Sequence, residues 1–202
     1  MKAKNSVAQR GRPRAFDIDQ ALNCAMEVFW RKGYEGASLP DLTKAMGINR
    51  PSMYAAFGNK EALFRRALDR YAQGPAHYVS DALSAPTAQE SIERLFFGVI
   101  DLVTHPRHPR GCLMVQGALC CGETAECIRN ELTTRREACV AQFRRRFQRA
   151  KRDGDLPRNA DPATLARFVA TIVHGIAVQA TSGATRAELQ RVAKLALRAL
   201  PI

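Results

Sequence analysis

Apolar residues recur every three to four positions along almost the whole chain, as at Ile18, Leu22, Ala25 and Phe29. This spacing places them on one face of a helix, and no segment shows the apolar–polar alternation of a half-buried strand. The pattern therefore predicts an all-α fold. Nine helices are expected, over about residues 17–33, 38–47, 49–57, 60–74, 87–104, 112–121, 124–152, 161–182 and 185–200.

The ends of these helices are marked by residues with a known local role. Asp17 and Thr87 precede apolar-periodic segments, where their side chains can accept the unpaired amide hydrogens of a first helical turn. Gly33 and Gly47 follow such segments, and glycine readily takes the positive φ that closes many helices. The run Asp-Gly-Asp-Leu-Pro at 153–157 predicts a turn between two long helices.

Two short predicted helices, at 38–46 and 49–57, are joined by a turn that contains glycine. Packed with the preceding helix, such a pair forms a tri-helical unit that can hold its last helix in a DNA major groove roughly 12 Å wide. The side chains expected in the core of the unit are Leu42, Ala45, Met46, Ile48, Met53 and Phe57. Those expected to face outward, toward bases and phosphates, are Arg50, Ser52, Tyr54 and Ala55.

The chain carries a formal net charge of +12, which favours a polyanionic partner. Residues 1–14 contain five basic side chains and no acidic one, and we interpret them as a basic arm in which Arg12 and Arg14 contact DNA. A second basic run, 144–152, is more typical of a solvated helix end.

Charge by itself does not separate nucleic acid from a membrane surface. The chain has no run of about 18 apolar residues, so no membrane span is expected. No apolar stretch follows its first basic residues, so no secretory signal is expected either, and the cytoplasm is the simplest compartment.

The segment from Ser38 to Leu63 resembles the DNA-binding domain of the TetR family of transcriptional repressors. The family's usual string has Ala-Gly-Val-Ser before the recognition helix, Leu-Tyr within it and Lys-Glu-x-Leu after it. Here the corresponding residues are Met-Gly-Ile-Asn at 46–49, Met-Tyr at 53–54 and Lys-Glu-Ala-Leu at 60–63. The basic Arg-Gly-Arg-Pro-Arg at 10–14 also fits, so the resemblance covers residues 10–68.

The resemblance implies which residues contact the DNA backbone. Tyr54, Lys60 and Ser38 match phosphate-contacting positions of the family, and Lys60 precedes a helix whose amides and dipole also favour an anion. Two positions depart from the family pattern. Ala56 stands where a phosphate-contacting histidine is usual, and Thr43 stands where a buried alanine is usual.

The resemblance also implies which residues read bases, and how the chain is organised. Arg50, Pro51 and Ser52 occupy the positions that usually read bases. The expected parts are a flexible arm at 1–14, a helix-turn-helix DNA-binding domain at 15–62, and a helical effector-binding and dimerisation domain at 63–202.

The expected function is that of a DNA-binding regulator, a repressor that a small-molecule effector releases from a palindromic operator. A homodimer is expected through residues 162–200, because the helix at 162–182 is apolar on more than one face. Effector contacts are expected from the helices of the larger domain, at Leu95, Phe96, Val99, Leu113, Phe143 and His174. For His174 alone, a satisfied core or interface histidine is the more ordinary interpretation.

The chain has six cysteines, and buried small hydrophobic side chains are their usual role. The alternative is a regulator that senses oxidants, electrophiles or a soft metal through Cys112, Cys120 and Cys121. His105 and His108 could add ligands, but the spacing matches no firm zinc pattern, so neither a metal nor another cofactor is predicted.

Two further classes of protein are alternatives to a regulator. An enzyme is not expected, because the sequence shows no paired catalytic signature and no glycine-rich phosphate loop. A nucleoid-associated protein would also be basic and helical, and this alternative stays open. Sequence-specific protection at moderate salt separates the two, since non-specific DNA binding fades steeply with salt.

Overall fold

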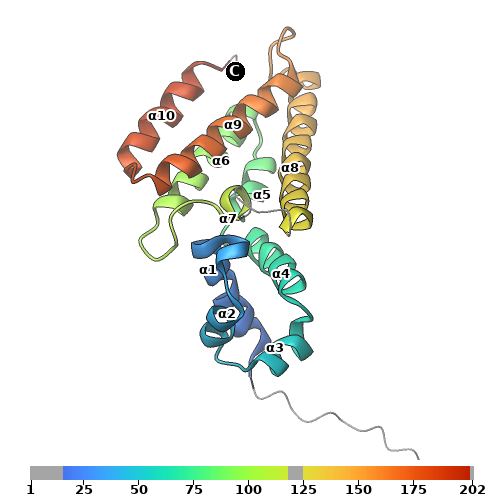
Figure 1. Ribbon diagram of the computed structural model, residues 1–202. Coiled ribbons are helices and arrows are strands. Elements are labelled where there is room, and N and C mark those ends of the chain that lie inside the picture. The colour runs from blue at the N-terminus through green and yellow to red at the C-terminus, as the bar shows by residue number, and fades with distance from the viewer. Residues whose placement is uncertain (1–15, 118–124, 201–202) are drawn as a thin grey trace, which may run out of the picture.

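The computed structural model describes residues 16–117 and 125–200, and these contain ten α-helices and no β-strand. The predicted all-α fold is therefore confirmed. Figure 1 shows two lobes, which we call the head (α1–α4) and the body (α5–α10). The head contains α1 (Ile18–Gly36), α2 (Leu39–Met46), α3 (Arg50–Phe57) and α4 (Lys60–Gln73). The body contains α5 (Tyr78–Leu83), α6 (Ala88–Thr104), α7 (Leu113–Gln116), α8 (Glu126–Arg152), α9 (Pro162–Thr181) and α10 (Arg186–Arg198).

Side chains cap most of these helices at the residues that precede them. Asp17, Thr87 and Asp161 each accept amide hydrogens of the first turn, which satisfies donors that the helix itself leaves unpaired. Ser38 and Thr185 form capping boxes, in which an acidic residue three positions later bonds back to the cap. The starts of these helices are therefore fixed by local sequence.

Two elements differ from the nine expected helices. α5 is additional, because a six-residue helix without a side-chain N-cap leaves too little periodicity to recognise. The helix expected over 112–121 is reduced to α7, Leu113–Gln116, within the described residues. α1 extends to Gly36, but Gly33 leaves helical geometry with φ 69° and ψ 179°, so regular helix ends where the sequence placed its stop.

Aromatic pairs between α1 and α4 form the core of the head. Phe29 meets Phe64 edge to face with ring centroids 4.9 Å apart, and Trp30 meets Tyr71 in the same way at 4.8 Å. All four side chains are buried, so each pair adds directional ring contacts to the apolar area that it removes from water.

The hydrophobic residues of α2 and α3 hold these helices against α1 and α4. Leu42, Met46, Met53 and Phe57 are buried as predicted, and Ile48 is half-buried. Ala45 is exposed, so its expected place in the core is wrong. α2 has eight residues and lies on the rim of a small lobe, so it buries only Leu42 and Met46 and leaves its other apolar side chains partly or fully exposed.

α6 lies inside the body, packed against α5, α9 and α10, while α8 and α9 pack together. Its residues Ile92, Phe96, Val99 and Ile100 are fully buried. Gly98 faces the ring of Tyr78 on α5, and a Cβ at this glycine would lie 2.6 Å from that ring. The close approach of α5 to α6 therefore requires glycine at this position.

Two hydrogen bonds attach the head to the segment 111–117, which contains α7. The indole nitrogen of Trp30 donates to the carbonyl oxygen of Gly111 at 2.9 Å, and this bond is buried. The amide of Tyr34 donates to the carbonyl oxygen of Gly117 at 2.8 Å. Both donors come from the end of α1, so the position of that helix end depends on the backbone of a body segment.

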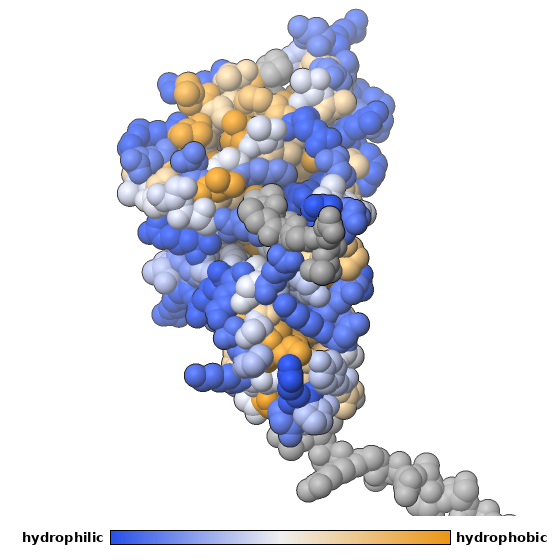
Figure 2. Space-filling model, in the orientation of Figure 1, coloured by the Kyte–Doolittle hydropathy of each residue, from blue (hydrophilic) through white to orange (hydrophobic). Residues whose placement is uncertain are grey.

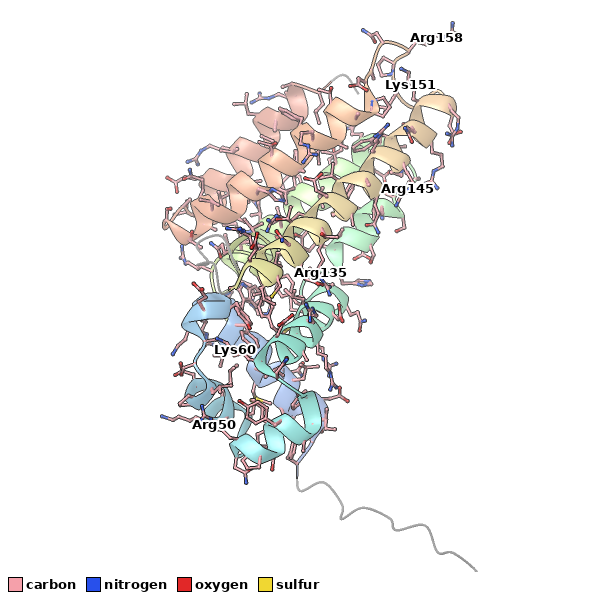
Figure 3. All side chains as sticks on the ribbon, turned by 45° about the vertical axis from the view of Figure 1, so that its right-hand side comes forward. Arg50, Lys60, Arg135, Arg145, Lys151 and Arg158 are labelled. Atoms are coloured by element: carbon pink, nitrogen blue, oxygen red, sulfur yellow. The ribbon has the colours of Figure 1, made fainter. Side chains whose placement is uncertain are left out.

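Ion pairs between α4 and α8 make a second connection. Arg135 bonds Asp69 at 2.7 Å, and Arg65 approaches Glu131 at 3.4 Å. Figure 3 shows Arg135 beside the junction of the two lobes, while Arg145 on the same helix lies farther from the head. The head is thus attached to the body through α1, which bonds the segment 111–117, and through α4, which bonds α8.

By length and composition, α9 could cross a membrane, and it is the one such helix among the residues described. In the fold it packs against α6, α8 and α10. Its Arg167 bonds both carboxylate oxygens of Glu137 on α8, at 2.7 and 2.8 Å. α9 therefore serves here as a packing helix of the body.

We predict that Gly33→Ala lowers the free energy of unfolding by about 1–3 kcal/mol, because its φ and ψ lie in a region that only glycine takes readily. The new Cβ would also lie 3.4 Å from the carbonyl oxygen of Gly117. Urea denaturation followed by circular dichroism measures the loss. The matched control is Gly36→Ala, where a Cβ meets only Lys32 Cβ at 3.5 Å. Equal stability of the two variants would contradict the prediction.

Candidate nucleic-acid interface and interior cavity

α3 presents its polar face to solvent at the end of the head. Asn49 caps the helix by accepting the amide hydrogen of Ser52 at 2.8 Å. Arg50 and Pro51 are exposed, Ser52 is half-buried, and the side chain of Tyr54 is 46% exposed although it is a large aromatic. Figure 3 places Arg50 in the head, at the opposite end of the molecule from Arg158. The predicted outward face of α3 is therefore accessible to a large partner.

Ser38 is exposed, but its hydroxyl already has a partner. It donates to the carboxylate of Asp41 at 2.7 Å and accepts the amide hydrogen of that residue at 3.2 Å. Lys32 approaches the same carboxylate at 2.8 Å. The hydrogen bonds from Lys32 and Ser38 lower the pKa of Asp41 to about 2. A phosphate contact by Ser38 would have to replace its bond to this carboxylate.

Lys60 begins α4, with its ammonium 4.5 Å from the centroid of the Tyr34 ring. Asn59 caps the helix by accepting the amide hydrogen of Ala62 at 2.7 Å. A cation at a capped helix start, where the amides and dipole also favour an anion, has the electrostatics of a phosphate site. The cation–π contact with Tyr34 fixes the direction of the Lys60 side chain.

The two departures from the family pattern have local explanations. The hydroxyl of Thr43 donates to the carbonyl oxygen of Leu39 at 2.9 Å, so a polar group replaces alanine without an unpaired donor. Near Ala56, the guanidinium of Arg66 donates to the Ala56 carbonyl at 3.2 Å and lies 4.8 Å from the Phe57 ring. Sequence reasoning missed Arg66, because only the packing of α4 against α3 brings it there.

A cavity of about 410 Å³ lies in the body and is bordered at one end by α4 of the head. Its lining comes from α4 to α9, and includes Leu95, Phe143 and His174 among the expected effector contacts. Phe96, Val99 and Leu113 lie in the surrounding core with no exposed surface. The apolar face of α6 is wide, and only the positions of its neighbours decide which part borders the cavity.

Two thiols, those of Cys112 and Cys139, lie on the wall of this cavity. The hydroxyl of Tyr71 donates to the sulfur of Cys112 at 3.4 Å, so the cavity wall touches a head helix directly. Burial raises the pKa of Cys112, and burial raises the pKa of Cys139 to about 11. Cys120 and Cys121, the other members of the predicted thiol cluster, lie outside the described residues.

A surface groove runs between α9 and α10, lined in part by Ile172, Ile176 and Val192. The largest exposed apolar side chains of this region are Val178, Val192 and Leu195, with Leu195 62% exposed. Figure 2 shows apolar surface gathered over α9 and α10 in the upper part of the molecule. This uncovered apolar face contrasts with the polar surface around it.

Both lobes match one family of known proteins. Residues 21–67 match the description bacterial regulatory proteins, tetR family, and residues 88–196 match a tetracyclin repressor-like C-terminal domain. The chain belongs to the TetR family. This membership makes it a DNA-binding helix-turn-helix regulator and not an enzyme, as the sequence resemblance implied.

Two relatives of this TetR-family chain resemble it over nearly its whole length. The HTH-type transcriptional repressor ComR of Escherichia coli is 36% identical over 197 residues, which cover 95% of this chain and 92% of that protein. The TetR family transcriptional regulator CifR, solved as a cysteine mutant with double-strand operator DNA, is 46% identical with a TM-score of 0.90. That match covers 94% of this chain and 100% of the CifR chain.

Among residues 16–117 and 125–200, no group of three or more His, Cys, Asp or Glu side chains is arranged to hold a metal ion. The rings of His105 and His108 are tilted against each other with centroids 4.3 Å apart, and the centroid of the His108 ring lies 5.3 Å from that of Trp30. These two histidines of the TetR-family body thus pack at the junction with the head.

We predict that iodoacetamide at neutral pH modifies Cys127 before Cys112. Cys127 is exposed, whereas Cys112 is buried and its raised pKa leaves less reactive thiolate than an ordinary cysteine has. Peptide mass spectrometry over a time course gives both rates. Raising the pH should narrow the difference as the thiolate fraction of Cys112 grows. Faster modification of Cys112 at neutral pH would show that burial does not protect it.

Proposed function

We propose that this chain is a transcriptional repressor that binds a palindromic operator as a homodimer and leaves it when a small molecule occupies the body cavity. The observation that carries the proposal is the exposed face of α3, with Arg50 and Tyr54 in solvent on a helix fixed by a buried core. The likeness to ComR, a repressor, and to CifR, which binds double-strand operator DNA, supports it.

The proposed DNA contacts divide into base readers and phosphate contacts. Arg50, Pro51 and Ser52 at the start of α3 would read base edges, where an arginine can bond guanine through two hydrogen bonds. Tyr54 and Lys60 would bind phosphates and fix the register of α3 in the groove. The remaining proposed contacts are Ser38, once its hydroxyl leaves Asp41, and the arm residues Arg12 and Arg14.

The proposed dimer uses the face formed by α9 and α10. Val178, Val192 and Leu195 are more exposed than large apolar side chains usually are, and a second copy of the same face would cover them. The pairing makes a four-helix interface and sets the distance between two α3 helices. For adjacent operator half-sites that distance is about one DNA turn, roughly 34–36 Å.

The proposed release mechanism runs through the junction between head and body. Cys112 on the cavity wall accepts a hydrogen bond from Tyr71 of α4, and its neighbour Gly111 accepts one from Trp30 of α1. A ligand that shifts the segment 111–117 therefore shifts both head helices. Release requires only that the ligand bind the non-DNA-binding arrangement more tightly than the other.

The same proposal includes the division into an arm at 1–14, a DNA-binding domain at 15–62 and an effector-binding, dimerising domain at 63–202. α4 begins at Lys60 and runs unbroken to Gln73, so a single helix would connect the two functional parts. A cytoplasmic location follows from the proposed access to chromosomal DNA.

Thiol sensing is a second candidate function, favoured by the position of Cys112 on the cavity wall. An electrophile with an activated C=C bond that enters the cavity would add to its sulfur. The S–C bond forms as the C=C π bond breaks, and the thiol proton, passed through solvent, ends on the neighbouring carbon. Reversible ligand binding is the first candidate and thiol sensing the second, because burial raises the pKa of the Cys112 thiol and so lowers the fraction present as reactive thiolate. N-ethylmaleimide distinguishes the two: operator release that Cys112→Ser abolishes and Cys127→Ser preserves would establish thiol sensing.

We predict that Arg50→Ala and Tyr54→Phe weaken operator binding in different ways. Loss of an arginine–base contact costs about 1–3 kcal/mol per half-site and relaxes the preference at one base position. Loss of the Tyr54 hydroxyl costs roughly 1 kcal/mol per half-site for operator and scrambled DNA alike, because phosphates carry no sequence. Fluorescence anisotropy with both DNAs measures these effects.

A salt series extends the same experiment to Lys60. Lys60→Ala should reduce the salt slope of binding by about one unit per phosphate contact, whereas Tyr54→Phe should leave the slope unchanged, since tyrosine is neutral. Three variants that all bind operator as wild type does would show that α3 is not the recognition helix. Equal footprints on operator and scrambled DNA at moderate salt would instead favour a nucleoid-associated protein.

We predict that Leu195→Lys converts the dimer to a monomer, because it would place a charge on the exposed apolar face that the proposed dimer buries. Sedimentation at micromolar concentration measures the change in mass. Lys194→Ala is the matched control, since Lys194 is the exposed neighbour of Leu195 on α10. A wild-type chain that sediments as a monomer would contradict the proposed assembly.

A further inference from the structure

Two side chains with a permanent charge are among the described residues that line the body cavity, and both are positive: Arg135 and Arg136, from α8. The ionisable His174 of α9 lies on the same wall. No aspartate or glutamate is among the described residues of the lining. The rest of the wall is largely aliphatic or aromatic, including Leu83, Leu95, Val140, Phe143, Val169 and Val173. The cavity therefore combines an apolar wall with a positively charged part.

The charge of Arg135 is already compensated. Its guanidinium bonds Asp69 at 2.7 Å and Glu131 at 2.8 Å, and these bonds belong to the junction with the head. Arg135 therefore has two carboxylate partners without any ligand.

Arg136 differs from its neighbour, because no carboxylate pairs with it in the part of the chain that the structure describes. Its guanidinium donates to the carbonyl oxygen of Met114 at 2.9 Å and to the hydroxyl of Thr133 at 3.0 Å. Both partners are neutral, and the side chain is half-buried. Arginine keeps its charge in proteins, and the carboxylate whose charge acts on Arg136, that of Glu137, already bonds Arg167. This partly desolvated cation therefore has no carboxylate of its own.

His174 adds a neutral donor to the same region. Burial lowers its pKa, and the nearby charges of Arg136 and Arg167 lower it further. Its pKa therefore lies below that of an ordinary histidine, so the ring is mostly neutral at pH 7 and has one N–H to donate.

We propose that the cavity binds an amphipathic organic acid, whose carboxylate or similar anionic group bonds Arg136 and whose apolar part lies against Leu95, Phe143 and Val169. This inference rests on the proposed function and names the class of effector that it takes. A carboxylate bonds a guanidinium through two parallel charge-assisted hydrogen bonds, and it supplies the counter-ion that Arg136 lacks. The cavity of about 410 Å³ falls in the usual range for small-molecule sites.

The same contact gives the acid a direct effect on the junction. Arg136 donates to Met114, which belongs to α7, the helix inside the segment that holds the end of α1. An acid that draws the guanidinium into the cavity competes with Met114 for its donors. Binding of the acidic group thereby loosens α7 from α8, which a neutral ligand of the same shape does not do.

The experiment compares acids with neutral molecules of the same shape. Octanoate and cinnamate are titrated into the full chain beside octanamide and cinnamamide, and binding is followed by calorimetry and by the fluorescence of Trp30. Trp30 is the single tryptophan of the chain and bonds Gly111 beside the cavity wall. We expect an acid to bind about tenfold more tightly than its amide, because a hydrogen bond to a charged group is stronger than a neutral one.

Arg136→Gln should remove this preference, so that acid and amide bind within about twofold of each other. The matched control is Arg144→Gln, which removes one positive charge from an exposed site on the same helix and should keep the preference. Circular dichroism confirms that both variants are folded. Failure of both acids to bind, equal affinity for acid and amide, or an unchanged preference in Arg136→Gln would each overturn the inference.

Operator affinity without ligand is measured separately for the same proteins. A wild-type chain that binds no operator contradicts the proposed function and says nothing about the cavity. A chain that binds operator and is released by a neutral compound, but not by either acid, keeps the proposed function and overturns the inference on the ligand class.

Discussion

The attachment of α1 to the segment 111–117 is the constraint on which the rest of the structure depends. Two backbone carbonyls of that segment, at Gly111 and Gly117, receive hydrogen bonds from Trp30 and Tyr34 at the end of α1. The bond from Trp30 is buried, so its loss would leave an unpaired polar group in a low-dielectric junction. The orientation of α1 therefore depends on the backbone conformation of this segment, while ion pairs to α8 hold α4.

The same segment also lines the cavity, so the junction connects the cavity with the DNA-binding head. Cys112 and Met114 line the cavity, while the neighbouring carbonyls bond the head. Tyr71 of α4 touches the cavity wall through the sulfur of Cys112. A small displacement on the cavity side is thus transmitted by direct contacts, because a packed junction has few intermediate arrangements.

The arginines of this protein fall into two groups: those that bond carboxylates within the chain, and those that have no such partner and can bind an anionic ligand or DNA. Arg135, Arg65 and Arg167 all bond carboxylates, and they join α8 to α4 and to α9. Arg136 has only neutral partners within the described residues, and Arg50 lies in solvent on α3. The net charge of +12 is therefore less informative than the places where a positive charge faces a cavity or an open surface.

Local sequence determined the elements and the recognition surface of this protein. Caps such as Asp17 and Ser38, and the stop at Gly47, act on the backbone within one helical turn, so their effect is visible without a fold. The exposed positions Arg50 and Tyr54 follow from the periodicity of a short helix, and the family string gives their expected roles. The family itself was apparent from residues 38–63, because helix-turn-helix geometry is encoded locally.

The tertiary structure decided which apolar residues are buried, which side chains line the cavity and which charges are paired, because these depend on contacts between helices far apart in the sequence. Ala45 is exposed because α2 lies on the rim of the head. α5 can approach α6 because Gly98 has no side chain at the place where the ring of Tyr78 packs. Leu95 lines the cavity while its neighbour Phe96 is buried in the core. Arg135 bonds Glu131 within its own helix, but its second carboxylate, Asp69, is 66 positions away and is brought near only by the packing of α4 against α8. Periodicity predicts that a face is apolar, but only packing between distant helices determines what that face meets.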